Sequence, residues 1–298
     1  MFCFFIFVLI GTLFCPIEIK QDAVLHEESE FVAFLRVKNE INTIEACLNS
    51  IDKVFDRIVI IHSDEPDDGS IEVMNKWCEK RSYCEIHEYP YMVISQHDPR
   101  MKGKVKPENT LASYYNFGLT FFKPNDWVVK VDGDQIYIKE KLKQTFEKIK
   151  NETKENDNDN FAFFVKGWNT LIWNKSLVLK SEMPIMGSDL DQFIIKRKYI
   201  PNFIQGRYWE RSVLSNSIFV EFNDPIFFHF QDNCYKEFNS FSTSELAISK
   251  ITPLNEEQIS SYKKYILPLL IQTKSPYKRL RLRKYLLQSK YQRLTKNT

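Results

Sequence analysis

The sequence predicts one large α/β domain with a mostly parallel β-sheet and flanking helices. Apolar runs of strand length alternate with segments in which apolar residues recur at helical spacing. The run at 127–131 is apolar on both faces, which is typical of a strand buried inside a parallel sheet. Of the 298 residues, 43% are hydrophobic, enough for a substantial core.

The first half of the chain predicts its elements in a regular order. The first strand is predicted at 31–37, and Ile41, Ile44, Leu48 and Ile51 then mark a helix. The further elements are strands at 57–61, 84–87 and 127–131 and helices at 70–80 and 109–122. Such alternation predicts parallel neighbours joined by right-handed crossovers.

The second half has a weaker pattern. We expect a polar loop at 150–160, strands at 161–165 and 171–179, and a late strand at 218–230 that ends near His229. Taken together, the patterns divide the chain into a hydrophobic, membrane-associated or packed segment at 1–24, a main domain at 25–250 and a basic helical extension at 251–298.

Both ends of the chain suggest contact with a membrane. The first 17 residues carry no charge but lack the features of a cleaved signal, and the run is slightly short for a full span, although an anchor stays open. Residues 274–298 contain nine Lys and Arg and no acid, which fits either an anionic membrane surface or a solvated helix. We expect a cytoplasmic protein, peripheral on the inner face of a bacterial plasma membrane. The net charge of only +2 implies no nucleic-acid partner.

The six cysteines form neither a Cys-x-x-Cys pair nor a zinc-binding spacing. We therefore expect ordinary reduced thiols, with Cys47 on the apolar face of a helix.

The most informative feature is the acid pair Asp132 and Asp134, which directly follows the buried strand at 127–131. Ligands bind at the carboxyl ends of strands in such sheets. Two close carboxylates repel each other unless a cation lies between them, and a hard divalent ion shared with phosphates is the usual solution. An Asp-Gly surface turn is the alternative, but the apolar residues on both sides of the pair disfavour it.

Other strand ends contribute polar residues to the same edge. Arg36, Asn39 and Glu40 follow the first predicted strand, and Asp64 and Asp68 follow the second. Taken alone, Asp68 is better explained as part of a helix cap. The sequence contains no P-loop and no dinucleotide-binding glycine motif.

These segments resemble a known family. The matching stretches are 34–40, 68–72, 88–91, 113–116 and 126–137. With them the chain resembles inverting, family-2-like bacterial glycosyltransferases of the GT-A fold, and most closely the β-1,4-N-acetylgalactosaminyltransferases that extend lipooligosaccharide. The resemblance is good over about residues 31–145 and thin beyond.

The resemblance implies a UDP-sugar donor, a glycan or glycolipid acceptor, and Mn²⁺ or Mg²⁺ as cofactor. The metal ligands that it implies are Asp132, Asp134 and His229. The nucleotide-sugar site that it implies contains Arg36, Asn39, Glu40, Asp64, Asp68, Asn116 and Asp132.

An inverting transferase also needs a carboxylate that deprotonates the acceptor. Among the later acids we expect Asp189, beside the glycine turn at Gly187, or else Asp191. A helix cap is the competing role for Asp189. Two other functions stay open: a nucleotidyltransferase, which normally has a glycine-rich loop after its first strand, and a membrane-surface binding module, which leaves the acid pair unexplained.

Overall fold

The computed structural model describes residues 29–63, 68–94, 105–156, 158–173, 176–180, 185–186, 192–206, 210–215, 217–230, 251–252, 254–273, 275 and 281–282. The segment 1–24 and most of the basic tail therefore lie outside the described residues. Within the described ranges, no helix combines the length and hydrophobicity needed to cross a bilayer.

A sheet of 12 strands runs through the described part of the molecule, with the central order β13-β7-β6-β9-β4-β1-β2-β3. Four strands from the first half are mutually parallel neighbours, as predicted. They are β1 (Phe31–Arg36), β2 (Arg57–Ser63), β3 (Cys84–Tyr89) and β4 (Trp127–Asp132). Their carboxyl ends meet at one edge, because parallel strands share a direction.

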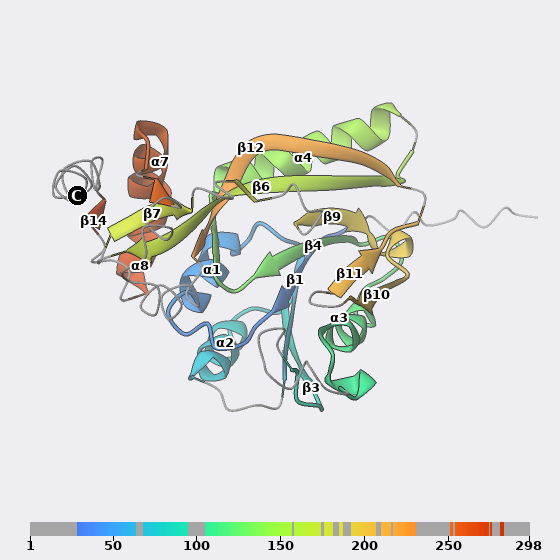
Figure 1. The fold of residues 1–298 in the computed structure, drawn as a ribbon. Coiled ribbons are helices and arrows are strands. Elements are labelled where there is room, and N and C mark those ends of the chain that lie inside the picture. Colours follow the sequence, from blue (N-terminus) through green and yellow to red (C-terminus); the bar gives the residue numbers. More distant parts are fainter. Residues whose placement is uncertain are drawn as a thin grey trace, which may run out of the picture.

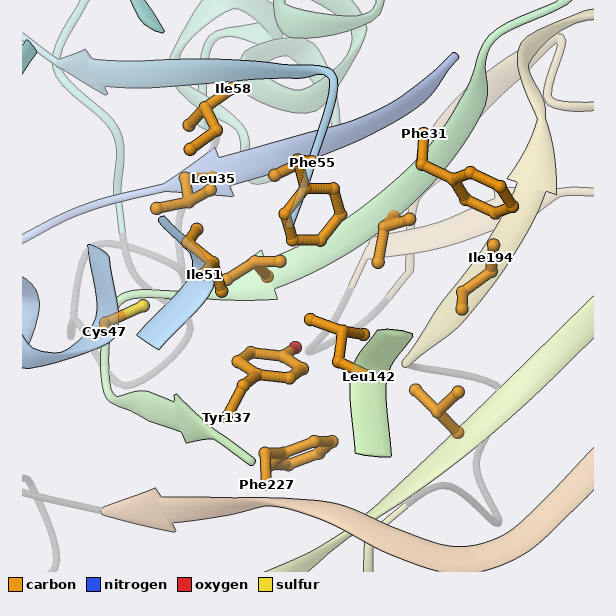
Figure 2. Packing of buried hydrophobic residues seen from close by; sticks show 14 of the residues in the cluster. Phe31, Leu35, Cys47, Ile51, Phe55, Ile58, Tyr137, Leu142, Ile194 and Phe227 are labelled. Carbon is orange, nitrogen blue, oxygen red and sulfur yellow. The ribbon is translucent and has the colours of Figure 1, made fainter. Parts of the chain in front are cut away.

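Helices cover both faces of these strands (Figure 1). On one face, α1 (Ile44–Ile51), α2 (Ser70–Cys78) and α4 (Lys139–Glu155) contribute to a large core cluster. Figure 2 shows part of this cluster, where Leu35 and Ile51 lie near Tyr137 and Phe227. On the other face, α3 (Leu111–Leu119) packs through Tyr114, Tyr115 and Leu119. The result is an α/β layer arrangement in which helices lie on both faces of the parallel strands.

The second half extends the sheet with two long strands. β6 (Phe161–Trp173) and β12 (Ile218–Phe230) are parallel partners, and β5 (Gln135–Tyr137) runs antiparallel to β12. β9 (Phe193–Lys196) is antiparallel to both β4 and β6 and so joins the two halves. The shorter elements of this region are β7 (Ser176–Lys180), β8 (Ile185–Met186), the hairpin β10 (Asn202–Gln205) with β11 (Glu210–Val213), and the 3₁₀ turns Pro107–Asn109 and Arg197–Tyr199.

The C-terminal part adds two short strands to β7 and a helical segment that packs onto the end of β12. The strands are β13 (Ile251–Thr252) and β14 (Arg281–Leu282), and the helical segment is α7 (Glu256–Ser261), a π-helical turn (Tyr262–Ile266) and α8 (Leu267–Gln272). Tyr262, Ile266 and Leu270 share a buried cluster with Trp168 and Phe228. An Asn255–Gln258 capping box fixes the start of α7.

Three expectations from the sequence need correction. The predicted polar loop at 150–160 is largely the end of α4, because Leu142, Phe146 and Ile149 bury one side of a helix whose other side is charged. The predicted strands at 161–165 and 171–179 are a single long β6 followed by β7. The predicted reduced state is wrong for one pair, since Cys78 and Cys84 form a disulfide with their Cα atoms 5.2 Å apart.

Candidate active site at the carboxyl end of β4

Asp132 lies among fixed positive charges. The parallel register of β1 and β4 places Arg36 directly beside Asp132. The Arg36 guanidinium is 3.7 Å from Asp132 Oδ1, and Lys130 Nζ is 3.7 Å from Oδ2. Lys130 is only 4% exposed. The sequence pointed to Arg36 but missed Lys130, although a lysine inside an otherwise apolar strand was the available signal.

Two side-chain amides also hold the Asp132 carboxylate. Gln192 Nε2 donates a hydrogen bond of 2.9 Å to Oδ2, and Gln135 Nε2 donates one of 3.2 Å to the same oxygen. The side-chain oxygen of Gln135, Oε1, accepts hydrogen bonds from the Asp132 backbone N–H and from the Tyr137 hydroxyl. Gln135 is therefore locked in orientation. Neither glutamine was predicted as a site residue.

These neighbours keep Asp132 ionised. Burial acts to raise the pKa of Asp132, but the positive charges of Lys130 and Arg36 outweigh it and lower the pKa from 3.8 to about 2. His229 and the Gln192 hydrogen bond act in the same direction. Asp132 therefore carries a full negative charge at neutral pH.

Asp134 has a different partner, His229. The distance between His229 Nε2 and Asp134 Oδ2 is 3.0 Å. The antiparallel pairing of β5 and β12 sets this contact, and the Phe230 N–H also donates to the Asp134 carbonyl at 2.8 Å. The structure thus brings together two of the residues that the sequence predicted as metal ligands.

Asn169 is a further polar residue beside His229. The two face each other across the parallel β6–β12 pair. Asn169 is 1% exposed, and neither polar atom of its side chain has a hydrogen-bond partner among the described residues. The sequence gave no signal for Asn169, because its position depends on the pairing of strands about 60 residues apart.

Glu40 lies against the glycine between the two acids. A Cβ placed on Gly133 would approach Glu40 Cγ to 3.0 Å, so a larger residue would displace the Glu40 side chain. Beneath this turn, the buried Cys47 thiol donates to the Asp132 carbonyl at 3.6 Å. Burial raises the pKa of the Cys47 thiol, and the negative charges of Asp134, Asp132 and Glu40 raise it further.

Several predicted nucleotide-binding residues have structural contacts. The Asp68 carboxylate accepts from the backbone N–H groups of Ile41 and Ser70, both at 3.1 Å, which ties the loop after β1 to the start of α2. Asn39, in that loop, has a φ of 57°. Asn116 forms two hydrogen bonds with the backbone of Phe203 and so anchors β10 to α3. A nucleotide-binding role for these residues stays a prediction. Asp64, Asp189 and Asp191 lie outside the described residues.

The described residues do not assemble a complete metal centre. Among the described residues, no group of three or more His, Cys, Asp or Glu side chains has an arrangement that could hold a metal ion. The chemistry of the site nevertheless fits a divalent cation, because a carboxylate oxygen of Asp134 and a ring nitrogen of His229 lie next to each other and both are atoms that such a cation binds. In addition, Asp132 Oδ1 is buried with no hydrogen-bond partner within the described part of the chain.

Residues 26–156 match the family model of β-1,4-N-acetylgalactosaminyltransferase (CgtA). The predicted resemblance is confirmed over this part of the chain. The match spans β1 to α4 and therefore includes Arg36, Lys130 and the acid pair. Together with the parallel strand order, it confirms the predicted α/β fold of the GT-A type and supports a glycosyltransferase. No curated protein matches the sequence significantly.

Solved structures give weaker likenesses. Staphylococcus aureus TarS (residues 1–349) is 14% identical, with 83% of this chain and 81% of that chain covered and a TM-score of 0.42. The same fragment in complex with UDP is 12% identical, with 89% and 78% covered and a TM-score of 0.42. Glucosyl-3-phosphoglycerate synthase from Mycobacterium tuberculosis, in complex with Mn²⁺, UDP and phosphoglyceric acid, is 14% identical, with 58% and 57% covered and a TM-score of 0.32. Likenesses of this degree carry no argument about function.

Proposed function

We propose that this protein is an inverting glycosyltransferase that moves a sugar from a UDP-sugar to a glycan. The observation that carries the proposal is the acid pair at the end of β4, whose Asp132 is flanked by Arg36 and Lys130, inside the segment that matches a transferase family. Fixed positive charge beside a strand-end carboxylate suits a nucleoside diphosphate, whose negative charge needs compensation as it leaves.

The matched family favours an N-acetylhexosamine or a hexose as the donor sugar. The same likeness favours an acceptor in lipooligosaccharide, lipopolysaccharide or capsule. A screen of several UDP-sugars, followed as slow hydrolysis of the donor without acceptor, would identify the sugar. Turnover of one UDP-sugar above all others supports the proposal, whereas hydrolysis of none of them argues against it.

We further propose Mn²⁺ or Mg²⁺ as the cofactor, with Asp134 and His229 as direct ligands and Asp132 as ligand or ribose contact. A bound divalent cation would neutralise the departing diphosphate. The residues of the chain prepare the site: Arg36 and Lys130 supply permanent charge, and His229 and Asp134 lie in contact, where they can share a ligand.

For the displacement itself we propose Asp189, or Asp191 in its place, as the group that removes the proton from the acceptor hydroxyl as UDP leaves. The acceptor oxygen would then attack the anomeric carbon from the face opposite the leaving UDP, which inverts the configuration.

The proposed function can be tested by calorimetric titration of UDP with and without Mn²⁺. We expect binding that excess EDTA abolishes and that Asp134→Asn weakens at least tenfold, the low end of the usual cost of a lost metal interaction. The melting temperature should change little, because Asp134 is not part of the apolar core. Glu147→Gln, an exposed change on α4, is the matched control. Wild-type affinity that is unaltered in EDTA would contradict the metal role.

A further inference from the structure

Hydrogen bonds hold the carboxylate of Asp132 at only one of its two oxygens. Gln135 and Gln192 both donate to Oδ2, from β5 and from the residue just before β9. Oδ1 has no hydrogen-bond donor within the described residues, and the Arg36 guanidinium is 3.7 Å away. The two glutamines therefore fix the rotation of the carboxylate and leave a defined oxygen for another partner.

The burial of the Gln192 side chain lowers the stability of the fold. This side chain is fully buried, at 0% exposure, and its Oε1 has no hydrogen-bond partner among the described residues. A protein that buries an amide with only one of its two polar atoms hydrogen-bonded is less stable than the same protein with an apolar side chain of that shape. The hydrogen bond from Gln192 to Asp132 is thus made at a cost in folding stability, which indicates a role at the acid.

Neutral donors suit this role better than charged ones. Lys130 and Arg36 already compensate the charge of Asp132. A third cation near Oδ2 would compete with any metal ion for the carboxylate, whereas an amide N–H orients the oxygen without adding charge. Reversing the amide of Gln192 would place two oxygens against each other, so its orientation is fixed by Asp132.

We propose that Gln192 is a positioning residue that, with Gln135, rotates Asp132 so that Oδ1 meets the metal–nucleotide complex. This inference rests on the proposed function and deepens it, because it names the oxygen of Asp132 that recognises the donor. Gln192 acts through Asp132 and need not touch the reacting atoms.

The test uses the full chain and UDP with Mn²⁺ as the probe. Gln192→Met keeps nearly the same length and volume but removes the donor, and Gln192→Glu keeps the shape but replaces the amide with a carboxylate, which when ionised lacks the donor and repels Asp132. We expect each variant to bind UDP at least about tenfold more weakly in the presence of Mn²⁺. Loss of a residue that hydrogen-bonds to a metal ligand usually has an effect of this size. In an Asp132→Asn background, Gln192→Met should change the affinity less than about twofold. Gln192 acts through the Asp132 carboxylate, so the effects of the two substitutions do not add.

Gln258→Met is the control, since Gln258 is also buried but belongs to the capping box of α7. It should lower the melting temperature and leave UDP affinity unchanged. Wild-type affinity in both Gln192→Met and Gln192→Glu overturns the positioning role alone, as does an equal loss in the Asp132→Asn background. Should Gln192→Met not fold, Gln192→Glu decides. If the wild-type protein binds no UDP, the proposed function fails and the positioning role fails with it.

Discussion

Asp132 and Asp134 are two residues apart but meet different surroundings. Asp132 faces Arg36 and Lys130 and accepts from two amides, so its charge is largely compensated within the protein. Asp134 faces the imidazole of His229 at 3.0 Å. A cation therefore gains more from Asp134 than from Asp132, because the Asp134 charge has less competition from fixed cations.

The role of His229 can be tested with His229→Ala. We expect the Mn²⁺ concentration needed for half-maximal UDP binding to rise about tenfold or more, because a nitrogen donor beside Asp134 is lost. The KM for the acceptor should change much less. Manganese titrations followed by calorimetry measure the first quantity, with His87→Ala on β3 as the control. An unaltered manganese titration in His229→Ala would refute the ligand role.

The low pKa of Asp132 predicts a pH dependence of stability. The folded-state pKa of about 2 lies below the ordinary value of 3.8, so the ionised carboxylate stabilises the folded state at higher pH. This contribution is complete above about pH 4 and is lost as the pH falls toward about 2. Urea unfolding at several pH values in this window should show a smaller loss of stability for Asp132→Asn than for wild type. Equal losses in both proteins would contradict the prediction.

The sequence could predict the residues whose signal is local. The acid pair stands out because it follows an apolar run, and Arg36 stands out because it ends another. Lys130 stands out less, as a lysine inside an apolar strand, and Gln135 contacts Asp132 from three residues away without a pattern that marks it. Gln192 and Asn169 carry no signal, because they reach the site only when strands distant in sequence are brought together, as β12 and β6 bring His229 beside Asn169.

At the scale of elements, α3 lies unusually close to the sheet. A Cβ on Gly118 would approach the ring of Phe34 to 2.4 Å and Ile61 Cδ1 to 2.8 Å. Only glycine allows this approach, which also brings the Tyr115 ring to 5.5 Å from the Arg36 guanidinium. The close packing of α3 thus helps to place the arginine beside Asp132.

Gly118→Ala should therefore lower the free energy of unfolding by about 1–3 kcal/mol, the usual cost of overpacking a core. Denaturant unfolding measures this change. In a Phe34→Leu background the cost should shrink, because the ring that the new methyl group meets is gone. A cost that is the same in both backgrounds would show that the Phe34 ring is not what excludes a side chain at position 118.

The first-half elements were predictable because each is a complete amphipathic or apolar unit. The late strand was predictable as well, since β12 has the expected bounds of 218–230, but α4 and β9 were not. The polar composition of α4 hides three buried apolar residues within 17, and β9, at four residues, is too short to show a period. The Cys78–Cys84 disulfide escaped prediction because its spacing matches no motif, and the pairing depends on how α2 leads into β3.

At the scale of the whole molecule, the basic tail and the apolar N-terminal run predict peripheral binding to an anionic membrane. A truncated chain whose last residue is Ser275 lacks eight of the nine tail cations but keeps α7 and α8. Binding of the full chain to vesicles that contain anionic lipid should weaken with added salt, and the truncated chain should sediment with them much less. Equal sedimentation of both proteins would show that the tail is not required.

Ser275 itself connects distant parts of the molecule. Its hydroxyl donates to the Asn42 carbonyl at 2.7 Å across 233 residues of sequence, next to the loop that carries Asn39 and Glu40. During synthesis, that loop can gain this contact only after almost the whole chain has left the ribosome, since long-range contacts form after their distant segments meet. Until then, Trp168 and Phe228 also lack the cover of Tyr262, Ile266 and Leu270. A nascent chain would hence bring Arg36 and Lys130 to Asp132 first, gain Gln192 and His229 later and finish the loop last. A stalled or prematurely ended product would therefore expose apolar surface next to an incomplete site.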